Sequence, residues 1–157
     1  MKKSAIFLAL FTLFADQLTK ALIVNNFIES ISIIKITSFF NLVLVYNKGI
    51  SFGLFNQVDY SNYIFSILSL IIICFLLKWA KDSVILAESL ALGLIIGGAI
   101  GNVSDRIFRP GVVDFIQLHW QNYYWPNFNV ADSAICLGVF VLMILNLDLK
   151  YFKRDSI

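Results

Sequence analysis

The sequence contains few of the residues that build metal sites and redox centres. It has two cysteines, Cys74 and Cys136, and one histidine, His119. Neither cysteine has a partner at the CxxC spacing that is typical of zinc and iron–sulfur sites, so we expect no metal and no cofactor. The serine, histidine and acid arrangement of a serine hydrolase is not evident either. Both cysteines lie in apolar runs, which favours a role in packing or in contact with lipid.

Charged residues are also scarce, at 14% of the 157 residues, whereas hydrophobic residues make up 59%. A soluble domain of this size is typically about half apolar and a quarter charged. The mean hydropathy is +0.82, and so small a globule could not bury that much apolar surface. We therefore predict an integral membrane protein that is surrounded by lipid and binds no nucleic acid.

Four apolar segments are each about as long as a helix that crosses a hydrocarbon core of roughly 30 Å. We predict a single all-α membrane domain over residues 1–157, with four transmembrane helices. The spans cover about residues 4–24, 63–79, 84–103 and 131–149.

The start of the chain also resembles a cleavable signal peptide, because Lys2 and Lys3 precede an apolar run. However, apolar residues resume after Asp16 and Lys20, and no small-x-small cleavage site is evident. We expect the first span to stay uncleaved.

The positions of the basic residues predict the orientation in the membrane, since Lys and Arg are enriched in cytoplasmic segments. With an even number of spans, all the basic groups flanking the spans fall on one side. Both termini are then cytoplasmic, and residues 25–62 and 104–130 lie on the outer face. These groups are Lys2 and Lys3, Lys78 and Lys81, and Lys150, Lys153 and Arg154.

Residues 25–62 are more than a simple loop, because SISIIKITSFFNLVLVYN is rich in the Ile, Val, Phe and Tyr that favour strands. A turn signal, Asn47-Lys48-Gly49, separates NLVLVY from ISFGLF. We predict a small β-sheet over about residues 28–55 on the outer membrane surface. In the second outer segment, Pro110-Gly111 ends the third helix and VVDFIQLHW follows as another extended run.

Acidic residues near membrane spans are costly and need an explanation. Asp16 and Lys20 have the i,i+4 spacing of a favourable ion pair on the first span. The pair is either purely structural or supports a nearby site. On the third span, Asn102, Asp105 and Arg106 are spaced i, i+3 and i+4, which predicts one polar cluster facing a site.

The third span also carries glycines four residues apart, at Gly93, Gly97 and Gly101. This small-xxx-small pattern allows another helix to approach closely. We interpret the glycines as a helix-packing face.

Two further aspartates flank the short connection between the third and fourth spans. Asp114 has apolar neighbours in VVDFI, so we expect its pKa to be raised. Asp132 lies in the first turn of the fourth span, where Asn129 is a plausible N-cap, and helix capping alone would explain it. Taken together, the two can meet at the membrane surface and share a proton, and such a pair can activate water and protonate a leaving amine.

Five motifs in order resemble those of the lipoprotein signal peptidases (signal peptidase II). They are FADQLTK, NLVLVYNKGISFG, GNVSDR, VVDF and FNVADSAI, and they extend from the first span to the fourth. The resemblance implies an aspartic peptidase of the bacterial inner membrane. Such enzymes cut prolipoproteins just before a cysteine that carries a diacylglyceryl group.

The resemblance also implies roles for individual residues. It further implies inhibition by globomycin-type compounds, and we expect a monomer. One departure is Pro110, which stands where the family pattern has glycine; this puts the local turn in doubt but leaves the aspartates in place. The implied catalytic residues are Asp114 and Asp132, the substrate-binding residues are Asn47, Gly49, Asn102, Arg106 and Asn129, and the supporting residues are Asp16, Lys20 and Asp105.

A second class of function uses the same residue types, because membrane-embedded acids also build proton relays. A small proton-coupled transporter or carrier subunit is therefore the alternative. Transporters usually bind near the midplane and contain repeated halves, whereas the polar residues here gather towards one face and no repeat is visible. In the peptidase, residues 52–62 are expected to close over the substrate.

Overall fold

The structure, a computed structural model, describes residues 1–27, 33–49 and 60–154. Most of the loop expected to close over a substrate, and the segment that follows the Asn47-Lys48-Gly49 turn, lie outside the described residues. The helices are α1 (Lys3–Asn26), α2 (Ser61–Asp82), α3 (Leu86–Phe108) and α4 (Val130–Arg154), and the strands are β1 (Ile33–Lys35), β2 (Phe40–Asn47), β3 (Val112–Trp120) and β4 (Tyr123–Tyr124).

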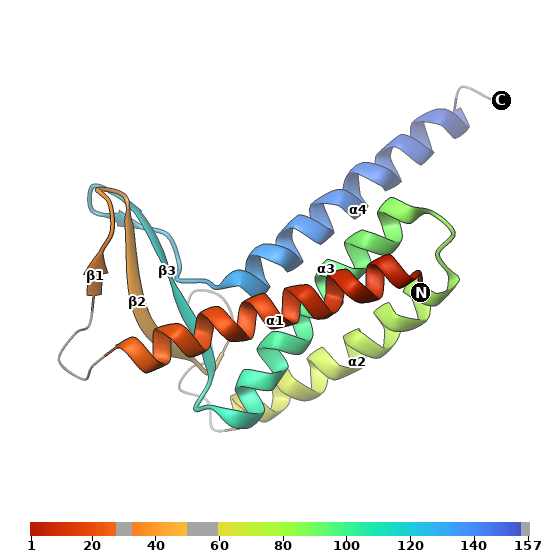
Figure 1. Ribbon diagram of the computed structural model, residues 1–157. Coiled ribbons are helices and arrows are strands. Elements are labelled where there is room, and N and C mark those ends of the chain that lie inside the picture. Colours follow the sequence, from red (N-terminus) through yellow and green to blue (C-terminus); the bar gives the residue numbers. More distant parts are fainter. Residues whose placement is uncertain (28–32, 50–59, 155–157) are drawn as a thin grey trace.

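Four described helices are long and apolar enough to cross a membrane, the fourth over Val130–Leu147. Helix α3 is the central one, because α1, α2 and α4 all pack against it (Figure 1). In its most apolar stretch 56% of the residues are buried, against 17–22% in the other three helices. The outer helices instead expose large apolar side chains such as Phe7, Phe75 and Phe140, as expected for a lipid-facing surface. The predicted four-helix membrane fold is thereby confirmed.

Glycines allow the helices to approach α3 closely. A Cβ atom added at Gly93 would lie 2.6 Å from the backbone oxygen of Ala5 on α1. One added at Gly98 would lie 2.6 Å from the backbone oxygen of Ala131 on α4. Backbone oxygens cannot move aside as a flexible side chain would, so any larger residue forces the helices apart. The glycine pattern thus serves helix packing, as predicted.

The sheet has four antiparallel strands in the order β1-β2-β3-β4. Its main pairing joins β2 to β3, from Phe40 opposite Leu118 to Asn47 opposite Val112. The sheet is therefore built from both outer segments, whereas the sequence analysis expected it within residues 28–55. Strand β3 belongs to the sheet because it leaves α3 at the Pro110-Gly111 turn, directly beside β2.

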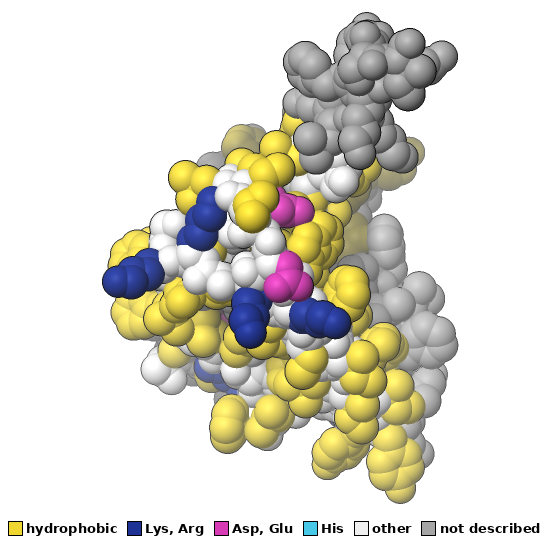
Figure 2. All heavy atoms as spheres, turned by 90° about the vertical axis from the view of Figure 1, so that its right-hand side faces the viewer, with side chains coloured by type: hydrophobic (Ala, Val, Ile, Leu, Met, Phe, Trp, Pro, Cys, Tyr) yellow, Lys and Arg dark blue, Asp and Glu magenta, His cyan; other side chains and the backbone are white. Residues whose placement is uncertain are grey.

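The two ends of the helix bundle differ. The sheet lies where α1 and α3 end and α4 begins, and the opposite end carries the start of α1 and the α2–α3 connection (Figure 1). There the Lys2 Nζ donates a hydrogen bond of 2.6 Å to the Val84 carbonyl oxygen. Viewed from this end, Lys and Arg side chains are conspicuous on the surface (Figure 2). The described lysines that flank the spans therefore lie at the end away from the sheet; they are Lys2, Lys3, Lys78 and Lys81.

Candidate active site

A cavity of about 680 Å³ lies at the sheet end of the bundle, between the sheet, α2, α3 and α4. One part is lined by apolar side chains of the three helices, among them Ile72, Ile95 and Ile135. The other part is polar. Its lining includes Asn47, Gly49, Asn102, Arg106, Asp114 and Asp132, all of which the sequence analysis selected.

Asp114 lies on β3, opposite Val45, and its side chain is buried. Its Oδ1 accepts a hydrogen bond of 2.8 Å from the Asn129 Nδ2, and its Oδ2 accepts one of 3.0 Å from the Asn47 Nδ2. Burial raises the pKa of Asp114 to about 7, and the nearby charge of Asp132 adds to the rise. The raised pKa expected from the apolar neighbours is confirmed.

Asp132 lies in the first turn of α4 and exchanges two hydrogen bonds with Asn129. The Asp132 backbone N–H donates to the Asn129 Oδ1 at 2.9 Å, and the Asn129 backbone N–H donates to the Asp132 Oδ2 at 3.3 Å. This reciprocal pair is a capping box, so Asn129 is the N-cap, as predicted. The other oxygen, Oδ1, accepts a hydrogen bond of 2.8 Å from the Asn102 Nδ2. Asp132 therefore caps its helix and also lines the cavity.

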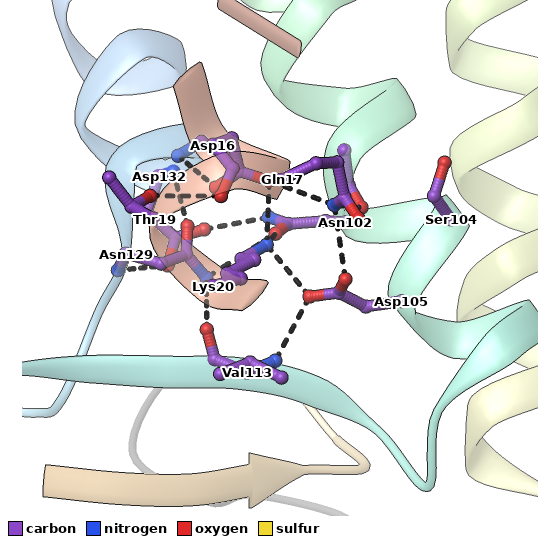
Figure 3. Close-up of polar contacts among 12 residues, drawn as sticks. Asp16, Gln17, Thr19, Lys20, Asn102, Ser104, Asp105, Val113, Asn129 and Asp132 are labelled. Atoms are coloured by element: carbon purple, nitrogen blue, oxygen red, sulfur yellow. Dashed lines mark hydrogen bonds and ion pairs between the residues drawn. The ribbon is translucent and has the colours of Figure 1, made fainter. Parts of the chain in front are cut away.

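Two asparagines connect the aspartates to each other and to α3, and Figure 3 shows Asn102 and Asn129 beside Asp132. The fully buried Asn129 contacts Asp114 through its side chain and Asp132 through its backbone. Its Nδ2 also lies 3.3 Å from the Asn102 Oδ1. Because each asparagine presents both a donor and an acceptor, the pair fixes the two carboxyl groups within one hydrogen-bonded network.

Arg106 brings a positive charge to the wall of the cavity. Its Nη2 donates a hydrogen bond of 3.0 Å to the Gly49 carbonyl oxygen, which ties α3 to the turn after β2. In the same turn the Gly49 N–H donates to the Asn47 Oδ1 at 3.0 Å. Asn47 in turn contacts Asp114, so Arg106 and this turn together hold one wall of the site.

A second group of buried charges lies beside the cavity, and we call Asp16, Lys20, Asp105 and Arg109 the ion cluster. The Lys20 Nζ lies 2.8 Å from the Asp16 Oδ2 and 2.8 Å from the Asp105 Oδ2, and all three side chains have no exposed surface. A third hydrogen bond, of 2.9 Å, runs from this Nζ to the Asn102 Oδ1 (Figure 3). Arg109 forms a further ion pair with Asp105.

The ion cluster also binds the backbone next to each catalytic candidate. The Asp16 Oδ1 accepts a hydrogen bond of 2.9 Å from the Ala131 N–H, directly before Asp132. The Asp105 Oδ2 accepts one of 3.0 Å from the Val113 N–H, directly before Asp114. The cluster therefore positions both aspartates through their neighbours in the chain.

The structure divides the polar group that was expected on α3. Asn102 and Arg106 line the cavity, whereas Asp105 belongs to the ion cluster. Successive helical residues differ by about 100° in direction, so Asp105 and Arg106 face different neighbours although both are near Asn102. Sequence reasoning missed two partners of Asp105: Gln17, whose Nε2 donates to it at 3.1 Å, and Arg109. The i,i+4 spacing of Asp105 and Arg109 was the available signal.

Comparison with known proteins gives one consistent result. The signal peptidase (SPase) II family model matches residues 8–147. The lipoprotein signal peptidase of Pseudoalteromonas atlantica is 42% identical over 142 residues, which cover 88% of this chain and 86% of that protein. That of Francisella tularensis subsp. novicida is 43% identical over 149 residues, or 91% of each chain.

Two solved structures, both described as bacterial membrane enzymes studied by the in meso method, share the fold. The one at 2.3 Å resolution superposes with a TM-score of 0.81 and 31% identity, over 92% of this chain and 87% of that chain. The one at 1.9 Å gives 0.80 and 30%, over 91% and 92%. The alternative of a proton-coupled carrier is therefore set aside. The chain belongs to the lipoprotein signal peptidase (signal peptidase II) family, the membrane aspartic peptidases that cleave the signal peptides of prolipoproteins.

Proposed function

We propose that Asp114 and Asp132 are the two catalytic aspartates of this peptidase and that they share one proton. The observation that carries this proposal is that both line one cavity and both contact Asn129. The pKa of Asp114, raised to about 7 by burial and by the charge of Asp132, supports one proton on the pair at neutral pH.

The chemistry needs no covalent intermediate. The ionised aspartate takes a proton from water while the water oxygen bonds to the scissile carbonyl carbon. The protonated aspartate gives its proton to the carbonyl oxygen, which leaves a neutral gem-diol. The first aspartate then passes its new proton to the leaving nitrogen as the C–N bond breaks. One diol hydroxyl returns its proton to the second aspartate, and the pair is restored.

The surrounding polar residues would orient the substrate and the dyad. Asn102 and Asn129 hold the carboxyl groups, and Arg106 offers positive charge to the peptide. Asn47 and Gly49 form the opposite wall. Asp16, Lys20 and Asp105 support the site from behind.

The family and the distribution of charge support a proposal for the substrate and for the orientation in the membrane. We propose that the substrate carries a diacylglyceryl group, whose chains stay in the bilayer, and that the cut falls just before the modified cysteine. An orientation with both termini in the cytoplasm and the cavity near the outer face of the inner membrane is supported by the span-flanking lysines at the end away from the sheet: Lys2, Lys3, Lys78 and Lys81. A globomycin-type inhibitor would compete for this cavity, and the enzyme would act as a monomer.

The test uses purified protein in detergent and a diacylglyceryl-modified prolipoprotein, with loss of the signal peptide followed on a gel. Asp114→Asn and Asp132→Asn should each lower kcat at least about a hundredfold, since each removes one member of an acid–base pair. Both variants must show a melting transition like the parent's. If a folded variant still cleaves at the parent's rate, the dyad assignment is wrong.

A further inference from the structure

The segment Trp125–Phe128 lies directly before the capping box and continues from β4 along the same side of β3. The Phe128 N–H donates to the Ile116 carbonyl oxygen at 3.1 Å, and the Ile116 N–H donates to that of Phe128 at 2.9 Å. The Trp125 N–H donates to the Leu118 carbonyl oxygen at 2.9 Å. These contacts are those of an antiparallel pair, so the segment extends the sheet beyond β3 on the side opposite β2.

Asn127 lies in the middle of this segment, opposite Gln117. In an antiparallel pair, a residue next to a doubly hydrogen-bonded pair directs its own N–H and C=O away from the neighbouring strand. Phe128 and Ile116 form such a pair. Among the residues that the structure describes, neither the N–H nor the C=O of Asn127 has a hydrogen-bond partner. The segment is therefore an open sheet edge.

A row of amide side chains fixes this edge to the sheet. The Gln117 Nε2 donates to the Asn127 Oδ1 at 3.2 Å, and the Asn41 Nδ2 donates to the Gln117 Oε1 at 3.0 Å. The row crosses from β2 over β3 to the segment, and Asn41 is buried. Held in this way, the edge loses little conformational freedom when another chain pairs with it.

The edge also adjoins the candidate catalytic residues. All four residues of Trp125–Phe128 line the cavity that contains Asp114 and Asp132. Asn127 is separated from Asn129, which contacts both aspartates, by a single residue. An extended chain advances about 3.3 Å per residue, so the nearest part of a peptide lying along this edge would be roughly two residues away from the dyad.

We propose that the extended segment of the prolipoprotein around the scissile bond binds by strand addition to Trp125–Phe128, with its backbone paired to the N–H and C=O of Asn127. An exposed strand edge is a template for such pairing, and backbone hydrogen bonds accept many side-chain sequences. Asn127 is thus a substrate-positioning residue. This inference rests on the proposed dyad, because strand addition would present an extended substrate to Asp114 and Asp132.

The test scans the substrate with N-methyl groups. Synthetic diacylglyceryl-modified peptides that span the signal peptide and the first mature residues carry one N-methyl group each, from the third residue before the scissile bond to the second after it. At the one substrate residue that pairs with Asn127, the N-methyl group should disrupt both backbone hydrogen bonds and raise KM about tenfold. The same group one residue to either side should have a smaller effect, because those N–H groups point away. At every position except the scissile nitrogen itself, kcat should stay within about twofold.

Variants of the enzyme provide the complementary half of the test. Asn127→Pro removes the N–H and should raise KM about tenfold with the unmethylated peptide, and proline is tolerated at an open edge. Asn127→Ala keeps both backbone groups, loses only the contact with Gln117, and should raise KM less. At the substrate position where the N-methyl group raises KM most, this rise should be smaller in Asn127→Pro than in the parent, because both changes disrupt the same pairing.

Several outcomes would overturn strand addition. These are a flat N-methyl scan in the parent, a KM for Asn127→Pro equal to the parent's, or an equal rise in KM for the proline and alanine variants. If Asn127→Pro does not fold, the scan in the parent decides by itself. The result is independent of the dyad, because a wrong dyad would appear as retained kcat in Asp114→Asn or Asp132→Asn while the pattern in KM persists.

Discussion

Two groups of aspartates, buried except for the partly exposed Asp132, lie side by side in this protein and differ in their partners. In the ion cluster, Asp16 and Asp105 contact the cations Lys20 and Arg109. In the cavity, the carboxyl groups of Asp114 and Asp132 accept hydrogen bonds from asparagine side chains and from one backbone N–H of the described residues. Cations balance the negative charge, whereas neutral amides only orient it.

The difference separates a structural role from a chemical one. A carboxylate with a cation as partner stays ionised and can hold helices together. Two carboxyl groups that are close to each other and bound mainly by amides cannot both ionise easily, so they keep a mobile proton. Asn102 contacts both groups, since it accepts from Lys20 and donates to Asp132. Three changes, two to the ion cluster and one to the pH, test this division.

Removing the central cation should unfold the structural group. Lys20→Met leaves the Asp16 and Asp105 carboxylates buried without their shared cation. Breaking a buried ion pair in this way lowers the stability of the fold by about 3–5 kcal/mol. Thermal melting in detergent should show a large fall in the transition temperature. Lys35→Met, on the exposed edge strand β1, is the matched control and should melt like the parent. If Lys20→Met melts like the control, the cluster does not hold the fold.

The proton-sharing group should instead respond to pH. Cleavage requires one protonated carboxyl group, and the pKa of Asp114 is raised to about 7. Above that pH the protonated form declines, so kcat/KM should fall about tenfold per unit. Initial rates between pH 5 and pH 9, with melting temperatures taken at each pH, provide the measurement. A rate that stays level to pH 9 in a folded enzyme would contradict a shared proton.

The smallest effect is expected at the rim of the ion cluster. The Arg109 side chain is 22% exposed, so water screens its pair with Asp105 more than it screens that of Lys20. Arg109→Gln should cost about 1 kcal/mol or less in stability and leave kcat unchanged. A loss comparable to that of Lys20→Met would show that the two cations contribute equally, which removes the distinction between the centre and the rim.

The positions of the helices and of the aspartate pair could be predicted from the sequence, for clear physical reasons. Long apolar runs have few alternatives to membrane helices. Asp114 and Asp132 flank one short connection, so chain continuity alone keeps them near the same end of the bundle. The N-cap role of Asn129 followed from its place before the fourth span. Local information was sufficient in each of these cases.

What could not be predicted depends on contacts between distant parts of the chain. The pairing of β2 with β3 joins residues about seventy positions apart, and no local pattern encodes that choice. The split between Asp105 and Arg106 depends on which helix packs on each side of α3. The edge at Asn127 appears only once the segment before α4 is seen to pair with β3.

The hydrogen bond between Asp16 and the Ala131 N–H joins residues 115 positions apart, and it has a consequence for the order of events in the cell. At about 5–20 residues per second of synthesis, the first helix waits on the order of ten seconds for its partner. Asp132 and the start of α4 are synthesised only after Asp16, Lys20 and Asp114. With Asp114 and Asp132 as the proposed dyad, a growing chain already carries Asp16, Lys20 and Asp114 before it can act as a protease, and it gains that activity only once the start of α4 has been made.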